Sequence, residues 1–492
     1  MQTITIHGRR TLHGSIRPAA AKNSTLPLLA ATLLCDGPCR LRDVPRLADV
    51  DTSLALLDAV GARVRRCGAD LCTRPADRLC GDIPEHLAGA MRSSVFYLAP
   101  LLCRVGYVRL PLPGGCRLGP RPVDIHLAGL AAMGAEVELE GIAVTLRRTG
   151  PLHGVDFTLR LPSVGATMTL LMAACCAAGQ TVLRGAAQEP EIGDMIAFLS
   201  ACGADIQGAG TPVLTVQGGR PLGGAFHRPL PDRIAAATYA AALACAGGQI
   251  EIAGCDPASY DSFLRFLAGT GVQVSRAGDC VRLARDPAVP LRGGAHLRAD
   301  AWPAFATDTA PLAAAVLLTA AGESEIYDSL FANRFACAAG FAAMGAACTV
   351  RGRQLTLPGG AVLHGTDVTA PDLRGGAALL APAGMRTCPE RCGGWGRRSP
   401  ETFRRLPLTL HHRAGHARPL RGSRPGTRPI MAALLLKFFT FSCKVCRFPP
   451  KIHPLLRSAL SKRAGQAVFF YEFLAKVLKL RGKFAILINS YM

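Results

Sequence analysis

A short pattern of apolar and polar residues recurs five times along the chain and predicts a helix followed by a strand. Apolar residues at spacings of three and four form one buried helix face, a glycine ends the helix in a left-handed turn, and alternating residues form a strand. The copies are DTSLALLDAVGARV (51–64), DIHLAGLAAMGAEV (124–137), DMIAFLSACGADI (194–206), YDSFLRFLAGTGVQV (260–274) and CAAGFAAMGAACTV (337–350), with marker glycines Gly61, Gly134, Gly203, Gly271 and Gly345 at intervals of 68 to 74 residues.

A second helix, rich in Ala and Leu, starts about 24 residues before each marker helix and ends at another glycine. Two helices and their strands make a unit of about 70 residues, which predicts an α/β repeat fold. A sixth unit begins at 371–384, but its second helix is missing because the residues around position 415 have no apolar face. The second glycines are Gly37, Gly106, Gly179, Gly247 and Gly322.

Residues 161–183 carry no charge and are long enough to span a membrane. They contain Pro162, three Thr, two Gly and Gln180, and the repeat divides them into a helix and a strand, so we expect no membrane span. The N-terminus MQTITIHGRR lacks the apolar stretch of a signal peptide, which favours a cytoplasmic protein.

The net charge of +22 is concentrated at one end of the 492-residue chain. Residues 385–492, the tail, hold 22 of the 56 Lys+Arg and 3 of the 34 Asp+Glu, so residues 1–384, the body, carry only +3. A strongly basic protein would favour nucleic acid or an acidic membrane as its partner, but a nearly neutral body does not. We therefore expect no nucleic-acid partner.

The tail is a different kind of sequence from the body. Residues 386–430 are rich in Arg, Pro, Gly and His and have no helical or strand period, as a high-GC gene would when read in a wrong frame. We interpret the tail as a frameshifted or mis-joined segment, unrelated to the body or disordered. The alternative is a basic appendage that binds nucleic acid or a membrane surface, but aromatic interleaving and a repeated basic face are scarce.

Fifteen of the 19 cysteines fall in the body, many within apolar runs such as Cys175-Cys176. None of the fifteen has a C-x-x-C or His-paired spacing, so we interpret most of them as small buried residues in a reducing compartment. In the tail, Cys443 and Cys446 have that spacing without a second pair, which is weak evidence for zinc. We expect no metal site.

Two residues of the body stand where chemistry is favoured. Cys116 lies in a Gly/Pro-rich stretch that predicts a surface loop, and Arg117 and Arg121 would favour its thiolate; the alternative is a packed cysteine. Lys22 opens the first helix, where an ammonium and backbone N–H groups would bind an anion. The alternative is a solvated lysine, but the other 33 of the 34 basic residues in the body are Arg.

Ten motifs follow one another over residues 1–384, about four-fifths of the chain: AAKNSTLPLLAATLL (20–34), DVDTS (49–53), MRSS (91–94), LPGGCRLGPRPVDIH (112–126), PSVGAT (162–167), EPEI (189–192), LPDRI (230–234), FATD (305–308), FANRF (331–335) and PDLRGG (371–376). In this order and spacing they closely resemble the UDP-N-acetylglucosamine 1-carboxyvinyltransferases, enolpyruvyl transferases of the EPSP synthase family. Each motif alone would be weak.

The resemblance implies two similar domains, each an inside-out α/β barrel of three βαβαββ-type repeats. The chain begins in one domain, makes the other and returns. Residues 22–229 would form the domain that carries Cys116, and residues 1–21 with 230–384 would form the second. The sixth repeat would be incomplete, and residues 385–492 would lie outside the family.

The resemblance also implies transfer of enolpyruvate from phosphoenolpyruvate to the 3′-hydroxyl of UDP-N-acetylglucosamine, by addition and then elimination of phosphate, with no cofactor or metal. This reaction is the first committed step of peptidoglycan synthesis and so serves the cell wall, cell shape and cell division. Cys116 is the implied proton donor, can add covalently to phosphoenolpyruvate and is alkylated by fosfomycin. Asp308 is the implied base for the sugar hydroxyl, although it could also be a helix N-cap.

Further residues are implied to bind the substrates. Lys22, Asn23 and Arg121 would bind phosphoenolpyruvate. Arg92, Arg233, Asp308 and Arg374 stand at the helix starts of other repeats, which would converge on one cleft; for each arginine the alternative is a surface ion pair. The implied nucleotide-binding residues are Arg121, Pro122, Val123, Asp124, Ile125, Leu161, Pro162, Ser163, Val164 and Leu330.

The chain departs from the family at several positions. Ala235 and Ala332 replace glutamates, Pro311 falls inside a helix that it could kink, and Leu161 stands where some members have Lys. The family's H-I-D-R-G-Y segment is missing from the tail. The alternative to an active enzyme is an inactive or truncated relative that at most binds sugar nucleotide. The shikimate-pathway transferase of the same fold is disfavoured by Gly-Gly-Cys and PSVGAT.

Overall fold

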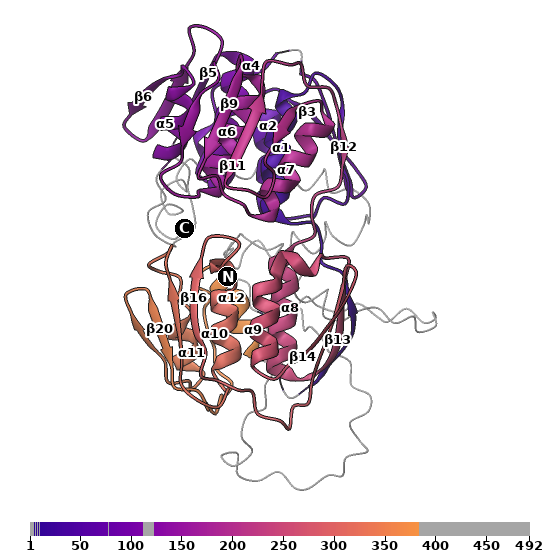
Figure 1. The fold of residues 1–492 in the computed structure, drawn as a ribbon, viewed down its shortest axis with the longest axis vertical. Helices are drawn as coiled ribbons and strands as arrows, with labels where there is room; N and C mark the ends of the chain where they lie inside the picture. Colours follow the sequence, from indigo (N-terminus) through magenta and orange to yellow (C-terminus); the bar gives the residue numbers. More distant parts are fainter. Residues whose placement is uncertain are drawn as a thin grey trace, which may run out of the picture. The chain divides into compact units, whose positions relative to one another are not determined.

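Each of the five complete repeats predicted from the sequence forms its own β-sheet (Figure 1). The strand before the marker helix pairs antiparallel with the second strand of the hairpin after that helix, so the three strands lie in the order first, third, second. The sequence repeat is therefore confirmed as a structural repeat. The strands are β2 (Cys39–Leu41), β4 (Asp70–Arg74) and β3 (Arg63–Cys67); β5 (Tyr107–Pro111), β7 (Ala143–Arg147) and β6 (Glu136–Glu140); β9 (Gln180–Arg184), β11 (Val213–Gln217) and β10 (Asp205–Gln207); β13 (Gly248–Ala253), β15 (Cys280–Arg285) and β14 (Gln273–Ala277); and β18 (Ser324–Asp328), β20 (Gln354–Leu357) and β19 (Thr349–Arg351).

The structure is a computed structural model that describes residues 4, 6, 8, 10–76, 78–111 and 123–382. The predictions for Cys116, Arg121, Pro122, the second half of the sixth unit and the tail lie outside the described residues. Among those described, no helix is both long enough and apolar enough to cross a membrane.

The marker helices end where their glycines predict. Each marker glycine follows its helix with a φ between +88° and +105°, a conformation that side chains other than glycine rarely adopt. The helix therefore stops and the chain turns back into the hairpin strand that follows. The marker helices are α2 (Ala48–Ala59), α5 (Asp124–Ala132), α7 (Pro190–Ala201), α9 (Asp261–Gly269) and α11 (Ala338–Ala343).

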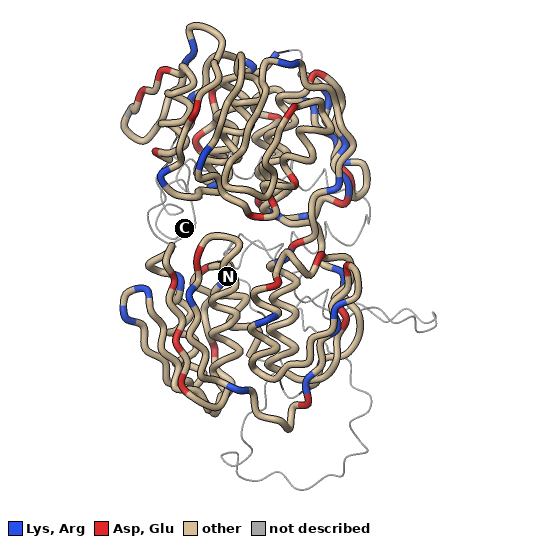
Figure 2. Tube along the Cα trace, viewed as in Figure 1, with Lys and Arg blue, Asp and Glu red and all other residues tan. Residues whose placement is uncertain are grey.

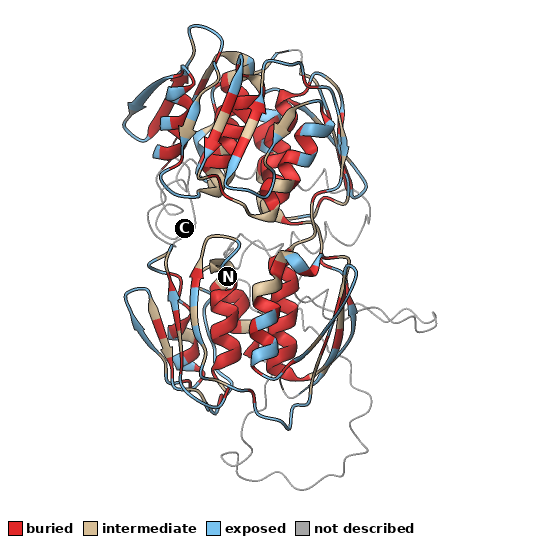
Figure 3. Ribbon diagram, in the orientation of Figure 1, coloured by how far each residue is buried: buried red, intermediate tan, exposed pale blue. Residues whose placement is uncertain are grey.

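The other helix of each unit is buried along most of its length (Figure 3), although Arg104 in the last turn of one of them is exposed. Every residue of α8 (Arg233–Ala246) and of α10 (Ala310–Leu317) is buried. Such helices have no polar face because sheets and other helices surround them. The remaining helices of this kind are α1 (Lys22–Ala31), α4 (Leu98–Val105), α6 (Val164–Cys176) and α12 (Leu373–Leu380), the last of which begins the sixth unit as predicted.

Short 3-10 helices and one further α-helix complete the helical elements that the structure describes. They are η1 (Thr32–Leu34), η2 (Arg92–Tyr97), η3 (Pro257–Tyr260), η4 (Thr307–Thr309) and α3 (Glu85–Ala88). Pro311 lies in the first turn of α10, directly after η4. A missing N–H breaks no hydrogen bond in a first turn, so the kink that the sequence suggested has no cause there.

Parallel strands extend four of the sheets at one edge. The strand β12 (Phe226–His227) pairs with β2, although the two are far apart in sequence, and β1 (Leu12–Ile16) pairs with β13 in the same way. Each of these two pairings brings together parts of the chain that are more than 180 residues apart: residues 40–41 with 226–227, and residues 12–16 with 248–252. The other two are β8 (Asp156–Thr158) on β9 and β16 (His296–Asp300) on β18, with β17 (Phe305–Ala306) beside β16.

Buried apolar residues form two separate cores. The first core contains residues between Leu26 and Leu222, and the second contains Ile16 and residues between Ala235 and Ala381. Residues 161–183 belong to the first core as the helix α6 and the strand β9, as their interrupted pattern predicted. The domain boundaries at residues 21/22 and 229/230, and the count of six repeats, stay predictions.

Gly193 inside α7 and Gly203 just after it allow the cost of a left-handed backbone to be measured apart from the cost of a steric clash. Gly203 has a φ of +105°, and a Cβ there would meet no atom closer than 3.9 Å, so Gly203→Ala introduces strain without a clash. We expect it to lower the free energy of unfolding by about 1–2 kcal/mol in urea. The control is Gly193→Ala inside the helix, where a Cβ meets no described atom within 4 Å, and which should gain about 0.5–1 kcal/mol. Equal effects would contradict the left-handed turn.

Candidate functional site

The start of α1 carries the first group of predicted site residues. Lys22 is the first residue of the helix, and no described side chain caps the helix start. The Lys22 ammonium donates a hydrogen bond of 2.7 Å to Asp49 of α2, and both side chains are about one-third exposed. Asn23 is half-buried beside it. An ammonium at a helix N-terminus favours an anion, which would have to compete with Asp49 for Lys22.

A buried carboxylate fixes this end of α1 to two other segments. Asp194 of α7 accepts hydrogen bonds from the Ser24 hydroxyl and, at 3.2 Å, from the Leu230 N–H. His227 Nε2 lies 2.8 Å from the other oxygen of Asp194. Ser24 and Asp194 are buried, so the position of Lys22 and Asn23 depends on α7 and on the segment 227–230.

Arg92 begins the 3-10 helix η2, the helix-start position that the sequence predicts. Burial and then the charge of Arg92 lower the pKa of His126 to about 3, so His126 is neutral at pH 7. The Nδ1 atom of His126 lies 2.9 Å from the Thr169 hydroxyl, which links α5 to α6. The charge of Arg92 thus acts near the starts of these two helices.

The two predicted nucleotide-binding segments lie together in the structure. Asp124, the first residue of α5, forms an ion pair with Arg160, which directly precedes Leu161 and Pro162. Leu161 and Pro162 are exposed, whereas the side chains of Val123 and Ile125 are buried in the first core. Only the backbone of Val123 and Ile125 is therefore suited to touch a ligand. Ser163 caps α6 by accepting a hydrogen bond from the Ala166 N–H, and Val164 is half-buried.

Asp308 of η4 lies between two arginines of the second core. Its Oδ1 atom is 3.3 Å from Arg374 Nε and 3.4 Å from Arg334 Nη1. Burial by itself would raise the pKa of Asp308, but Arg374, Arg334 and Arg233 together hold it well below its usual range. Asp308 is therefore a firmly ionised carboxylate. It is not the N-cap of a helix, because Ala306 precedes η4 and Thr309 precedes α10.

Arg334 is the buried partner that holds the Asp308 region together. Its side chain is 1% exposed, its Nε donates to the Thr307 hydroxyl at 3.0 Å, and it lies 3.6 Å from the buried Asp328. Asp328 in turn accepts hydrogen bonds from the N–H groups of Leu330 and Phe331. The same network of hydrogen bonds and ion pairs therefore fixes the positions of Asp308 and of Leu330, whose side chain is exposed.

Arg233 forms a buried ion pair. The alternative considered from the sequence was an ion pair at the surface. The Arg233 guanidinium donates to both oxygens of Glu191 at 3.0–3.3 Å and lies over the Trp302 ring. Burial opposes the charge, but Glu191 and Asp308 raise the pKa of Arg233. Because Glu191 belongs to α7, this pair connects α7 with the start of α8.

The helix-start rule identified the charged residues but not their partners. Lys22, Arg92, Arg233 and Arg374 lie in the first two positions of their helices, as predicted, and Asp308 lies in η4. Asp49, Glu191 and Arg334 were missed as site residues although they stand in the quoted motifs DVDTS, EPEI and FANRF. Figure 2 shows few charged residues along the buried helices, such as α8 and α10, whose places are labelled in Figure 1.

Comparison with known proteins gives a consistent group of relatives. Residues 6–388 match the family described as EPSP synthase (3-phosphoshikimate 1-carboxyvinyltransferase). The chain is 39% identical over 391 residues to a UDP-N-acetylglucosamine 1-carboxyvinyltransferase from Rhodospirillum centenum, covering 77% of this chain and 90% of that one. It is 40% identical over 383 residues to the protein of this name from Acidiphilium cryptum, with the same coverage.

Solved structures agree with the fold. The enolpyruvyl transferase NikO from Streptomyces tendae matches with a TM-score of 0.69 and 25% identity, covering 77% of this chain and 90% of that one. An EPSP synthase from Acinetobacter baumannii matches with a TM-score of 0.62 and 16% identity, covering 78% and 91%. The mixed α/β fold described above is therefore the EPSP-synthase-like fold.

The low pKa of Asp308 has a consequence for stability. Its pKa is about 3.9 in an unfolded chain and lower in the folded one, so the stabilisation is complete above about pH 4 and is lost as the pH falls through the folded value. We expect Asp308→Asn to be less stable than the wild type at pH 7, with a difference that shrinks below pH 4. Urea unfolding at several pH values measures this difference.

The control for this experiment is Asp58→Asn, at an exposed position of α2. It should follow the wild-type pH dependence. A difference between Asp308→Asn and the wild type that stays constant from pH 7 to pH 3.5 would show that the arginines do not lower the pKa of Asp308.

Proposed function

The chain belongs to the EPSP synthase family of enolpyruvyl transferases, and on this basis we propose that it transfers enolpyruvate from phosphoenolpyruvate to the 3′-hydroxyl of UDP-N-acetylglucosamine. Phosphate is released, and the reaction is the first committed step of peptidoglycan synthesis. The observation that carries the proposal is the group of Asp308 and Arg374, which lie at helix starts, with the buried Arg334 beside Asp308. The sugar nucleotide is proposed because the relatives at about 39% identity carry its name.

The anionic groups of phosphoenolpyruvate need cations. We assign the binding of these anionic groups to Lys22, together with the N-terminus of α1, and to Arg121. Asn23 would add a neutral hydrogen-bond donor. Lys22 donates to Asp49 in the structure, so binding would exchange a carboxylate of the protein for the phosphate of the substrate. The exchange suits this site because both side chains of the pair are partly exposed and cost little to separate.

Asp308 is proposed to accept the proton of the sugar 3′-hydroxyl. A base works best when its pKa is near the working pH, and two neighbouring arginines make Asp308 a weak base. A substrate anion that draws Arg374 away would raise the pKa of Asp308. Because Arg374 is 11% exposed and Arg334 only 1%, Arg374 is the arginine that can turn toward the substrate.

Cys116 is proposed as the proton donor for the methylene carbon. In the addition step, the sugar oxygen bonds to the central carbon of phosphoenolpyruvate while Cys116 protonates the methylene carbon. In the elimination step, the Cys116 thiolate takes a proton back from the new methyl group, and the bond between the central carbon and the phosphate oxygen breaks, so that phosphate leaves. The double bond is then restored in the enolpyruvyl ether.

The uridine nucleotide is assigned to the segments 121–125 and 161–164 and to Leu330. The Asp124–Arg160 ion pair holds the first two segments next to each other. Leu161 and Leu330 are 42% and 39% exposed, so each offers an apolar surface on which a base or a sugar could pack. Ser163 is already used as the cap of α6, so its backbone is better suited to the ligand than its hydroxyl.

The proposal predicts a substrate-specific release of phosphate. The full chain should release inorganic phosphate from phosphoenolpyruvate with UDP-N-acetylglucosamine, but not with shikimate 3-phosphate or without acceptor. Cys116→Ala should lower kcat by at least about 100-fold because the proton donor is lost. The matched control is Cys80→Ala, an exposed cysteine that should keep wild-type turnover.

The remaining outcomes of this assay decide between the alternatives. Turnover with shikimate 3-phosphate alone would refute the acceptor. Binding of UDP-N-acetylglucosamine by the folded wild type without phosphate release would show that the chain is an inactive or truncated relative. That alternative was raised by Ala235, Ala332 and the tail, which depart from the family.

The retained lysine gives a second test of the phosphoenolpyruvate site. Lys22→Arg keeps the charge but replaces a compact ammonium by a planar guanidinium, so we expect KM for phosphoenolpyruvate to rise by about tenfold or more. The KM for the sugar nucleotide should change much less. Arg104→Lys, at the exposed ion pair with Asp36, is the control and should leave both KM values unchanged. If Lys22→Arg kept the wild-type KM for phosphoenolpyruvate, Lys22 would not be part of the phosphoenolpyruvate site.

A further inference from the structure

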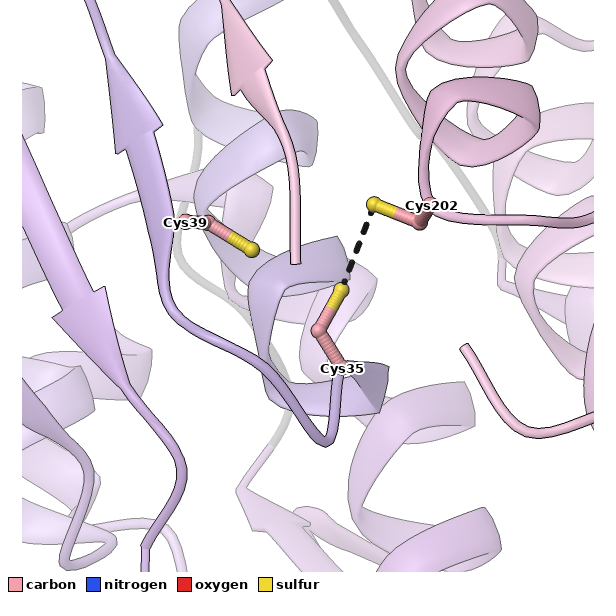
Figure 4. Close-up of side chains that lie close together, drawn as sticks. All are labelled: Cys35, Cys39 and Cys202. Carbon is pink, nitrogen blue, oxygen red and sulfur yellow. Dashed lines mark hydrogen bonds between the residues drawn. The ribbon is translucent and has the colours of Figure 1, made fainter. Parts of the chain in front are cut away.

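Three buried cysteines meet in the first core, outside the proposed active site (Figure 4). The sulfur atoms of Cys35, Cys39 and Cys202 all lie within 4.8 Å of one another, and Cys35 Sγ is 3.5 Å from Cys202 Sγ. The three residues are between 1% and 3% exposed. Sequence spacing does not predict the group, because Cys202 lies 167 residues from Cys35.

The backbone holds the three thiols in place. Cys35 follows η1, Cys39 begins β2, and Cys202 follows α7. The loop between Cys35 and Cys39 packs against Gly223 and Gly224 so closely that a Cβ on Gly37 would lie 2.4 Å from the Gly224 nitrogen. The carbonyl of Cys202 accepts a hydrogen bond of 2.7 Å from the Gly223 N–H. The packing of the backbone therefore positions the three cysteines.

The surroundings favour a cation between the sulfurs. Cys35 and Cys202 each stand at the C-terminal end of a helix, where the backbone carbonyls carry partial negative charge. Thiolates alone would be unfavourable at such ends, whereas a metal ion would be stabilised by both.

The number and type of ligands select the metal. Among the described His, Cys, Asp and Glu side chains, no fourth member joins the group. Structural zinc is almost always bound by four ligands, whereas thiolates without oxygen or nitrogen ligands favour Cu(I). A metal bound to three sulfurs at about 2.3 Å in a plane separates them by about 4.0 Å. The Cys35–Cys202 separation is 3.5 Å and no two of the three sulfurs lie more than 4.8 Å apart, so every separation is compatible with that value after shifts of about 1 Å or less.

The geometry points to a binding site for one Cu(I) ion on the sulfurs of Cys35, Cys39 and Cys202. Each bond replaces a proton or uses a lone pair of a thiol, with no change in the oxidation state of copper or sulfur. One, two or three thiolates would give the site a charge of 0, −1 or −2. The apolar surroundings favour the smaller charges, so binding releases fewer than three protons. The ion would join the end of η1 and β2 to the end of α7.

The test uses the full chain, reduced and kept without oxygen, with Cu(I) supplied together with a competing Cu(I) chelator. One copper should stay bound per chain, measured by native mass spectrometry as the mass of one copper less the displaced protons. Cys35→Ser and Cys202→Ser should weaken this binding by at least about 100-fold. The controls are Cys245→Ser, a buried cysteine of α8, and Cys443→Ser in the tail, which should keep the copper.

X-ray absorption by the copper of the wild type gives a measurement that does not depend on the folding of any variant. A first shell of sulfur atoms only, with the edge of Cu(I), supports the site. Loss of copper to the chelator, retention in Cys35→Ser, or nitrogen and oxygen neighbours would overturn it. A protein two mass units lighter, without copper, would identify a Cys35–Cys202 disulfide instead. Preferential retention of Zn(II) under the same competition would also overturn the assignment.

Discussion

Helices that are buried on all sides can carry charge only at their ends, and this constraint organises the whole protein. Every residue of α8 and α10 is buried, so a charged side chain in their interior would have to give up its hydration without compensation. At the first turn, in contrast, a side chain can reach a partner or a ligand. Lys22, Arg92, Arg233 and Arg374 stand there in four different helices. The packing of the cores thus decides where the chemistry can be.

Charges at these helix starts are paired with other side chains of the protein. Lys22 is bound to Asp49, and Asp308 lies between Arg374 and Arg334. The pairs differ in burial, from partly exposed at Lys22 to almost completely buried at Arg334. A ligand can therefore exchange with the exposed partner at small cost, while the buried partner keeps the site in shape. Arg233 and Glu191 belong to the buried kind and serve as structure.

The sequence was sufficient to predict the repeats because their signals are local. A helix face, a left-handed glycine and the alternating strand after it lie within about fifteen residues, and each of the five marker glycines has the positive φ that this pattern requires. The helix starts followed from the same register. The exposure of Leu161 and the burial of Val123 were not foreseen, because burial depends on neighbours that are distant in sequence.

Partners across the sequence could not be predicted from one chain. Asp194 contacts Ser24, Leu230 and His227, and these contacts exist only when α7 lies beside α1 and the segment 227–230. The three cysteines are a similar case, since their spacing resembles no metal motif. The residues involved do lie in or near quoted motifs, so the motifs marked the right regions without giving the geometry.

The two positions where alanine replaces a glutamate of the family, Ala235 and Ala332, can be accommodated by the fold although each loses a negative charge. Ala235 is buried in the first turn of α8, and its N–H is already bound by the Asp232 carboxylate. A glutamate there would place a second carboxylate beside Asp232, whereas Arg233 is neutralised by Glu191 without it. Ala332 is exposed, so a missing carboxylate leaves no buried charge unpaired there. Both alanines therefore leave the ion pairs of Arg233 with Glu191 and of Arg334 with Asp308 and Asp328 in place, and any loss of activity they cause would act through the substrate instead of the fold.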